Sequence, residues 1–142
     1  MTSDLLALTQ QLPNSLGVYS INTLPALQDT HYRNTNHQNN NNYRTLIVNL
    51  DCDALPGSHW VGVSEHAGLI EIFDSFGESP PPLLQVWAAR NSRQRVSNHL
   101  TIQAPLSINC GYFAFIFTLA RHYCRNLTDA CDLIINLNID SD

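Results

Sequence analysis

The sequence predicts an α+β fold: a single domain in which a small, mostly antiparallel sheet packs against helices. Three observations favour it. The chain has 142 residues, of which 44% are hydrophobic, so it has the size and composition of one domain with a buried core. Short apolar or alternating runs typical of strands occupy its middle. The segments follow one another as helix, strands, helix, strand, helix, helix, and two of the strands are joined by a short connection.

The first quarter of the chain begins with a short helix. Ser3 or Thr2 can cap a helix over residues 4–12, with leucines on one face. Residues 17–25 are first β-prone and then turn-like. Residues 34–42 form an Asn-rich polar tract with nothing to bury, which predicts a flexible loop within the single domain of residues 1–142.

Three strands are expected next. Residues 45–50 form a nearly continuous apolar run, as in a central strand. Residues 59–64 and 68–74 alternate between apolar and polar, and the four residues 65–68 are a short enough connection for a hairpin. A further strand is expected at 99–103.

Three helices are expected in the second half. A helix over 83–95 follows a run of prolines, which the first turn of a helix tolerates. The strongest helix runs over 107–125 and is apolar around most of its circumference, which predicts burial on most faces. A last helix begins at Asn126 or Thr128 as its cap and ends near residue 136.

Charge is scarce and mostly acidic. The chain has 12 acidic residues, 7 arginines and no lysine, for a net charge of −5. Basic residues gather only at Arg90, Arg93 and Arg95, so nucleic acid is not expected as a ligand. Three basic residues near the end of the central helix suit the negative end of its dipole: Arg121, His122 and Arg125.

The termini and the cysteines bear on location. The N-terminus has neither a basic start nor a long apolar run, and the longest apolar stretch, 111–120, is about half the length that spans a bilayer. The four cysteines form no CxxC pair or other metal-ligand spacing. We therefore expect a chain that is not secreted, makes no membrane contact, holds no metal and keeps its thiols reduced inside a cell. The four are Cys52, Cys110, Cys124 and Cys131.

Cys110 is the most informative of them because it lies in the first turn of the expected central helix. Unpaired backbone N–H groups and the positive end of the helix dipole favour a thiolate there, and the same N–H groups can hold an oxyanion. Gly111 leaves room for a substrate backbone. The alternative is a small buried hydrophobic residue, the usual state of a cysteine without a disulfide, and we adopt that interpretation for Cys124 and Cys131.

A thiolate nucleophile needs a base, and His59 is favoured among the six histidines because it opens a strand directly after a turn. Trp60 beside it could form a wall of the cleft. If strands 59–64 and 68–74 pair through the short hairpin, the end of the second strand returns beside the start of the first. Asp74 then lies next to His59 and can orient its imidazole.

Taken in order, these segments resemble the adenovirus protease (adenain) family of cysteine peptidases, which belongs to a wider group that includes the ubiquitin-like-protein proteases. The order His, acidic residue, Gln, Cys matches, as does the separation of seven residues between Gln103 and Cys110. The resemblance covers roughly residues 16 to 125. The matching segments are residues 17–25, Gly57-Ser58-His59-Trp60-Val61, Phe73-Asp74-Ser75-Phe76-Gly77, and Gln103 with Cys110-Gly111-Tyr112-Phe113.

The resemblance implies a thiol endopeptidase that cleaves viral precursor proteins, with glycine preferred before the scissile bond. It implies Cys110 as nucleophile, His59 as general base and acid, and Asp74 as the group that orients the imidazole, where adenain has Glu. It implies that Gln103 donates its side-chain amide N–H to the oxyanion hole and that Trp60 flanks the substrate cleft. Adenain also uses a DNA cofactor and a peptide joined through a cysteine, but residues 91–102 contain no cysteine and the chain is acidic, so no cofactor is expected.

Other functions remain open at this stage. A protease that releases ubiquitin or a ubiquitin-like modifier would use the same site on a folded substrate. An acyltransferase would need an acyl-CoA site, for which the chain has few basic residues. A non-catalytic α+β interaction module would leave the joint presence of His59, Asp74, Gln103 and Cys110 as coincidence. The oligomeric state is not predicted.

Overall fold

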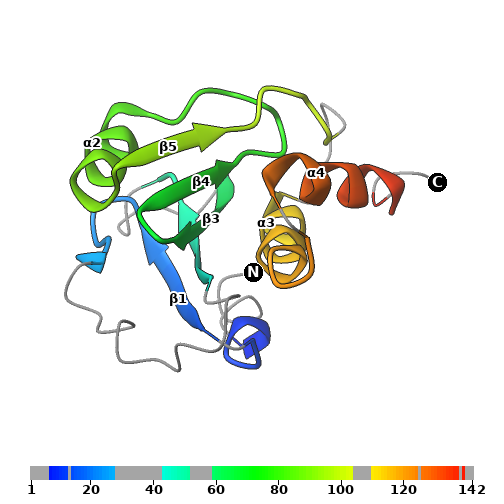
Figure 1. The fold of residues 1–142 in the computed structure, drawn as a ribbon, viewed down its shortest axis with the longest axis horizontal. Coiled ribbons are helices and arrows are strands. Elements are labelled where there is room, and N and C mark those ends of the chain that lie inside the picture. Colours follow the sequence, from blue (N-terminus) through cyan, green and yellow to red (C-terminus); the bar gives the residue numbers. More distant parts are fainter. Residues whose placement is uncertain are drawn as a thin grey trace.

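Five strands form one twisted sheet in the computed structural model, and helices cover both of its faces (Figure 1). The strand order is β1-β2-β3-β4-β5, so neighbours in sequence are neighbours in the sheet. The structure describes residues 7–12, 14–27, 43–51, 59–103, 110–124, 126–137 and 139. Residues 7–9 are helical, within the helix expected over 4–12. The polar tract at 34–42 lies outside the described residues.

The sheet is mixed. The three central strands are antiparallel: β2 (Arg44–Asn49), β3 (Trp60–His66) and β4 (Leu69–Phe73). Each edge strand is parallel to its neighbour, with β1 (Ser15–Ser20) beside β2 and β5 (Gln94–Ser97) beside β4. The predicted α+β class with one domain is confirmed, and the antiparallel part of the sheet is its centre.

A tight hairpin joins β3 to β4, as the short connection predicts. Ala67 and Gly68 occupy its two central positions with φ of 51° and 85°, the signature of a type I′ turn. Glu65 accepts a hydrogen bond from the Gly68 N–H at 3.2 Å. The register pairs Gly62 with Phe73, so residue 59 before β3 and residue 74 after β4 meet at the same end of the sheet.

Helix α2 (Pro82–Asn91) covers one face of the sheet. The alternation of the strands places aliphatic side chains there from β2, β3 and β4. They pack with Leu84, Trp87 and Ala88 of α2, and all are almost fully buried. The strand residues of this cluster are Leu46, Val48, Val61, Val63, Ile70 and Ile72.

Helix α3 (Cys110–Ala120) lies on the opposite face (Figure 1). Phe117 stacks on Phe73 of β4, with ring centroids 5.0 Å apart. Gly62 of β3 lies beneath the helix, where an added Cβ would be 2.6 Å from Phe117 Cδ2 and 3.0 Å from the Ala114 carbonyl oxygen. Glycine is needed there because any side chain would push α3 away from the sheet. The predicted burial of this helix is thus observed.

Helix α4 (Leu127–Asn136) packs beside α3 (Figure 1). Of the two expected caps, Asn126 is the one used: its side chain accepts a hydrogen bond from the Asp129 N–H at 2.9 Å. Within the described ranges, no helix combines the length and the apolar character needed to cross a bilayer.

Two expected elements lie elsewhere. The strand predicted at 99–103 is wrong, because the fifth strand is β5, over residues 94–97. Its side chains are mostly exposed, so it lacks the apolar alternation that identifies half-buried strands. Helix α2 accordingly ends at Asn91 instead of 95. The Asn91 amide donates to the Trp87 carbonyl at 2.8 Å, and its oxygen accepts from the Leu27 N–H at 2.7 Å.

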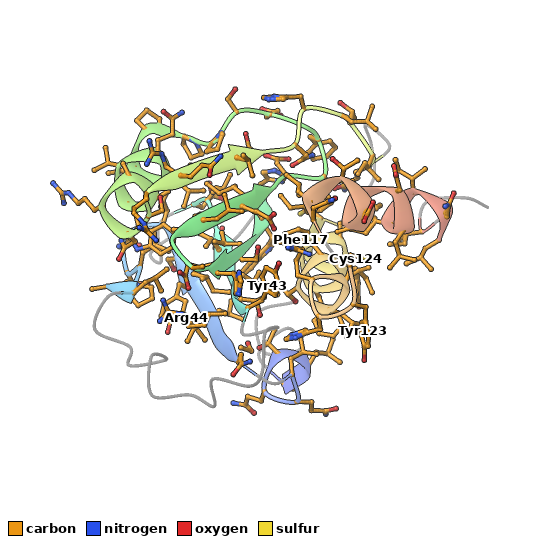
Figure 2. The ribbon with its side chains drawn as sticks, viewed as in Figure 1. Tyr43, Arg44, Phe117, Tyr123 and Cys124 are labelled. Carbon is orange, nitrogen blue, oxygen red and sulfur yellow. The ribbon has the colours of Figure 1, made fainter. Side chains whose placement is uncertain are left out.

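Arg121 and His122, which follow α3, do not serve as simple dipole partners. Arg121 is 1% exposed, and its Nε donates to Glu71 Oε1 on β4 at 2.6 Å. The guanidinium also lies 4.3 Å from the centroid of Tyr43, which projects on the side of the sheet that α3 covers (Figure 2). Burial and the charge of Arg121 lower the pKa of His122, which favours the neutral ring. Arg125 lies outside the described residues.

Candidate active site

His59 and Asp74 meet at one end of the β3–β4 hairpin. His59 immediately precedes β3, and Asp74 immediately follows β4. Their side chains are joined by a contact of 3.0 Å between His59 Nε2 and Asp74 Oδ1. The imidazole is 20% exposed and the carboxylate 6%, so the pair is shielded from most of the solvent. The juxtaposition that the hairpin implies is present.

Neighbouring backbone and an asparagine hold Asp74 in place. Oδ1 also accepts a hydrogen bond from the Phe76 N–H at 2.8 Å. The Asn98 side chain, at the end of β5, accepts from the Asp74 N–H at 2.8 Å and donates to the Asp74 carbonyl at 2.7 Å. Sequence analysis missed Asn98, and no local signal could have found it, because its role depends on β5 lying beside β4.

Cys110 is the first residue of α3 and is 6% exposed. Burial alone would raise the pKa of its thiol. The interaction with His59, backbone hydrogen bonds with Trp60 and Gly111, and the charge of His59 outweigh burial and lower this pKa below its ordinary value of 9.0. The surroundings of Cys110 therefore favour the thiolate, the nucleophilic form of cysteine.

His59 carries the complementary shift. Burial alone would lower the pKa of the imidazole, but the hydrogen bond with Asp74, the interaction with Cys110 and the charges of both raise it to about 10. Because Nε2 contacts Asp74, the nitrogen left for the thiol is Nδ1, which is buried and has no other side-chain or backbone partner in the described part of the chain. Both shifts favour an imidazolium beside a thiolate. Phe76 packs on the imidazole with ring centroids 5.2 Å apart.

Gln103 lies close to the same turn. It is 1% exposed, and its backbone N–H donates to the Ser75 carbonyl at 2.9 Å. Its side-chain oxygen accepts a short hydrogen bond from the Ser75 hydroxyl. Gln103 is therefore held by Ser75, the residue that follows Asp74.

The resemblance to adenain-like peptidases implies that Trp60 flanks the substrate cleft, and Gly111 is a second candidate there. Trp60 is 3% exposed and packs with Ile47, Cys110 and Ala114. Trp60 is therefore a core residue that lies beside the thiol. Gly111 is buried in the first turn of α3.

The remaining cysteines and histidines differ from this pair. Burial raises the pKa of Cys131 to about 11 and also raises that of Cys124, so both are ordinary thiols. His66 stacks on Tyr43, 4.5 Å between centroids. Cys52, His31 and His37 lie outside the described residues. Among the residues that are described, no three His, Cys, Asp or Glu side chains converge as metal ligands would.

Comparison with known proteins identifies the fold. No protein-family model matches the chain, and no curated protein matches it. Two crystal structures of the ASFV pS273R protease superpose on it. One gives a TM-score of 0.53 at 23% sequence identity and covers 69% of this chain; the other gives 0.56 at 16% and covers 82%. The SUMO protease Ulp1 gives 0.49 at 14%, over 95% of this chain and 73% of its own.

The chain has the fold of the pS273R protease, as the resemblance to adenain-like peptidases implies. It spans only 39% and 53% of the length of the two pS273R chains. At these identities the likeness concerns the fold alone.

Proposed function

We propose that this chain is a thiol endopeptidase with Cys110 as nucleophile, His59 as acid and base, and Asp74 as the group that orients His59. The observation that carries the proposal is the arrangement around His59. Its Nε2 contacts a buried carboxylate at 3.0 Å, and its Nδ1 is left for a thiol at the start of a buried helix whose pKa is lowered. A buried structural cysteine has no need of such a partner.

The reaction follows from these positions. The Cys110 thiolate forms a C–S bond to the carbonyl carbon of the peptide, and the carbonyl oxygen becomes an oxyanion. The Cys110 backbone N–H and the Gln103 side-chain N–H stabilise this oxyanion. His59 gives its Nδ1 proton to the amine as the C–N bond breaks, leaving a thioester. His59 then takes a proton from water, the hydroxide attacks the thioester, and the C–S bond breaks to restore the thiolate.

The substrate that we propose is a viral precursor polypeptide cleaved after glycine. The fold likeness to the ASFV pS273R protease supports a polypeptide substrate, and the preference for glycine rests on the resemblance to adenain-like peptidases. A reducing compartment, in a host cell or a virion, suits a nucleophilic thiol. It also suits Cys110, Cys124 and Cys131, which form no disulfide.

A peptide library read by mass spectrometry tests the proposal, with the wild type and Cys110→Ala compared under reducing conditions. We expect cuts only with the wild type, enriched in glycine before the cut. Cuts shared by both proteins, or absent from both on peptides and on viral precursors, would contradict it. Cuts confined to the precursor of a folded ubiquitin-like modifier would keep the site and change the substrate class.

The role of Gln103 has its own test. Gln103→Ala removes one oxyanion donor, which typically costs about 10²–10³-fold in kcat. Steady-state kinetics on the best library peptide measure the loss. Unchanged kinetics would exclude Gln103 from the reaction and leave the nucleophile and its base in place.

A further inference from the structure

The turn after β4 holds a second polar residue that the proposed reaction has not used. Ser75 is 1% exposed, although serine usually lies at the surface. Its hydroxyl donates a short hydrogen bond to Gln103 Oε1. Its carbonyl accepts hydrogen bonds from the N–H groups of Ile102 at 2.8 Å and Gln103 at 2.9 Å. Ser75 thus holds both the backbone and the side chain of Gln103.

The hydroxyl contact has a consequence for the amide. A glutamine side chain has an acceptor end and a donor end, and a half-turn about its last bond exchanges them. With Oε1 held by the Ser75 hydroxyl, the NH₂ group is kept at the opposite end. A reversed amide could still donate from its NH₂ group to the Ser75 oxygen, but its Oε1 would lose the hydroxyl donor and turn toward the oxyanion. The hydrogen bond that Ser75 donates therefore belongs to the productive orientation of the amide.

We propose that Ser75 is a positioning residue of the site: it locks the Gln103 amide so that its N–H, and not its carbonyl oxygen, is presented to the oxyanion. The inference rests on the proposed function, because only an acyl-transfer site gives the amide an oxyanion to bind. It extends that function by adding a residue that does not itself touch the substrate.

Several hydrogen bonds and close backbone packing hold the turn that carries Ser75, as a positioning role requires. The Gly77 N–H donates to the Asp74 carbonyl at 2.8 Å, and Gly77 has φ of 71°. An added Cβ on Gly77 would be 2.7 Å from the His99 carbonyl oxygen. Asn98 fixes the backbone of Asp74 from the other side. One short turn therefore orients both the base, through Asp74, and the oxyanion donor, through Ser75.

A double-mutant cycle tests the proposal with the wild type, Ser75→Ala, Gln103→Ala and the double variant, on the peptide that the library selects. We expect Ser75→Ala to lower kcat roughly tenfold with little change in KM, because an amide free to reverse binds the oxyanion only part of the time. In the Gln103→Ala background, Ser75→Ala should have no further effect, since Ser75 acts only through Gln103. Thermal melting of each variant measures the structural cost separately.

The alkylation rate of Cys110 is the second readout. It reports the thiolate and its partner His59, and it should be unchanged in Ser75→Ala because the oxyanion hole plays no part in it. Should Ser75→Ala not fold, Ser75→Cys keeps the shape with a weaker donor and should give an intermediate kcat. Mass spectrometry separates the new thiol from Cys110.

The possible outcomes separate the two proposals. Three results would each overturn the role of Ser75 and leave the peptidase intact. In the Gln103→Ala background, Ser75→Ala could lower kcat as much as it does in the wild type. Ser75→Ala could also change the alkylation rate of Cys110, or leave kcat unchanged in an otherwise active enzyme. Absence of any Cys110-dependent cleavage by the wild type would overturn both.

Discussion

The two ends of α3 both place a polar group against the same face of the sheet, yet the groups are paired differently. At the C-terminal end, Arg121 donates to Glu71 at 2.6 Å and to the Cys124 carbonyl, and Glu71 also accepts from Ser64 at 2.8 Å. At the N-terminal end, Cys110 meets an imidazole whose Nδ1 has no other partner within the described ranges.

The pairing at the C-terminal end of α3 suits a structural anchor, and the pairing at the N-terminal end suits a reactive site. We call them the anchoring end and the reactive end. A buried ion pair whose hydrogen bonds are satisfied is held in one geometry, which suits an anchor. A thiol and an imidazole that shift each other's pKa share a proton that can move. Figure 2 shows the anchoring end, with Tyr43 facing the α3 side and Tyr123 turned outward.

Removal of the Arg121–Glu71 ion pair at the anchoring end should have the largest effect on stability. Arg121→Met leaves the Glu71 carboxylate buried without its cation, and removal of one partner of a buried pair typically costs about 3–5 kcal/mol of unfolding free energy. Urea denaturation measures the loss. Turnover per folded molecule should change little. The combined replacement Glu71→Leu with Arg121→Met should recover most of the stability; if it does not, the pair is not the source of the loss.

Substitution at the reactive end should lower activity and leave stability nearly unchanged. Asp74→Asn keeps an oxygen for the Phe76 N–H but removes the charge that raises the pKa of His59. We expect kcat/KM to fall by about 10²-fold, with the urea midpoint nearly unchanged. Asp129→Asn, the same substitution at the start of α4, is the matched control. Equal activity of the two variants would exclude Asp74 from the site.

Gly62 lies beneath α3 between its two ends, so its substitution should affect both stability and the reactivity of Cys110. Gly62→Ala puts a Cβ 2.6 Å from Phe117 Cδ2, and overpacking of this kind costs about 1–3 kcal/mol. Since α3 must shift, Cys110 alkylation should also slow. Val63→Ala, on the opposite face, should lower stability without slowing alkylation. A Gly62→Ala variant with normal stability and reactivity would show that the helix position is not critical.

The rate of cysteine alkylation tests the reactive end without any substitution. Because the pKa of Cys110 is lowered and that of Cys131 is raised to about 11, iodoacetamide at pH 7 should label Cys110 roughly tenfold faster than Cys131, allowing for the lower nucleophilicity of a less basic thiolate. Peptide mapping by mass spectrometry measures both. Equal rates would contradict the proposed ion pair.

Turnover and labelling should also diverge at high pH. His59 has a pKa of about 10, so its imidazolium persists at neutral pH and loses its proton as pH rises through that value. Cleavage needs this proton for the leaving amine and should fall there. Alkylation does not need it and should not fall. As the pH falls through the lowered pKa of Cys110, both should decline because the thiolate is protonated.

Local pattern was sufficient for the elements that define the site. The apolar alternation of β3 and β4 and the length of their connection predicted a hairpin, and the hairpin alone brings His59 beside Asp74, because antiparallel pairing is fixed by a two-residue turn. The apolar run before residue 120 likewise predicted a buried helix with Cys110 at its start. These features depend on residues close together in the chain.

Tertiary structure decided what depends on distant partners. Arg121 pairs with Glu71, 50 residues away, whereas its place near a helix end suggested only an interaction with the dipole. β5 is an exposed edge strand without apolar alternation, so the sequence pattern favoured a strand at 99–103 instead. The hydrogen bonds between Asn98 and Asp74 could not be predicted, because they depend on the position of β5. Trp60 is a core residue because α3 covers it. Local periodicity and turn chemistry were enough to predict the buried strands, the β3–β4 hairpin and the buried helix, because these depend on residues close together in the chain. Only the packing of α3 and β5 against the sheet decided which polar groups are buried together.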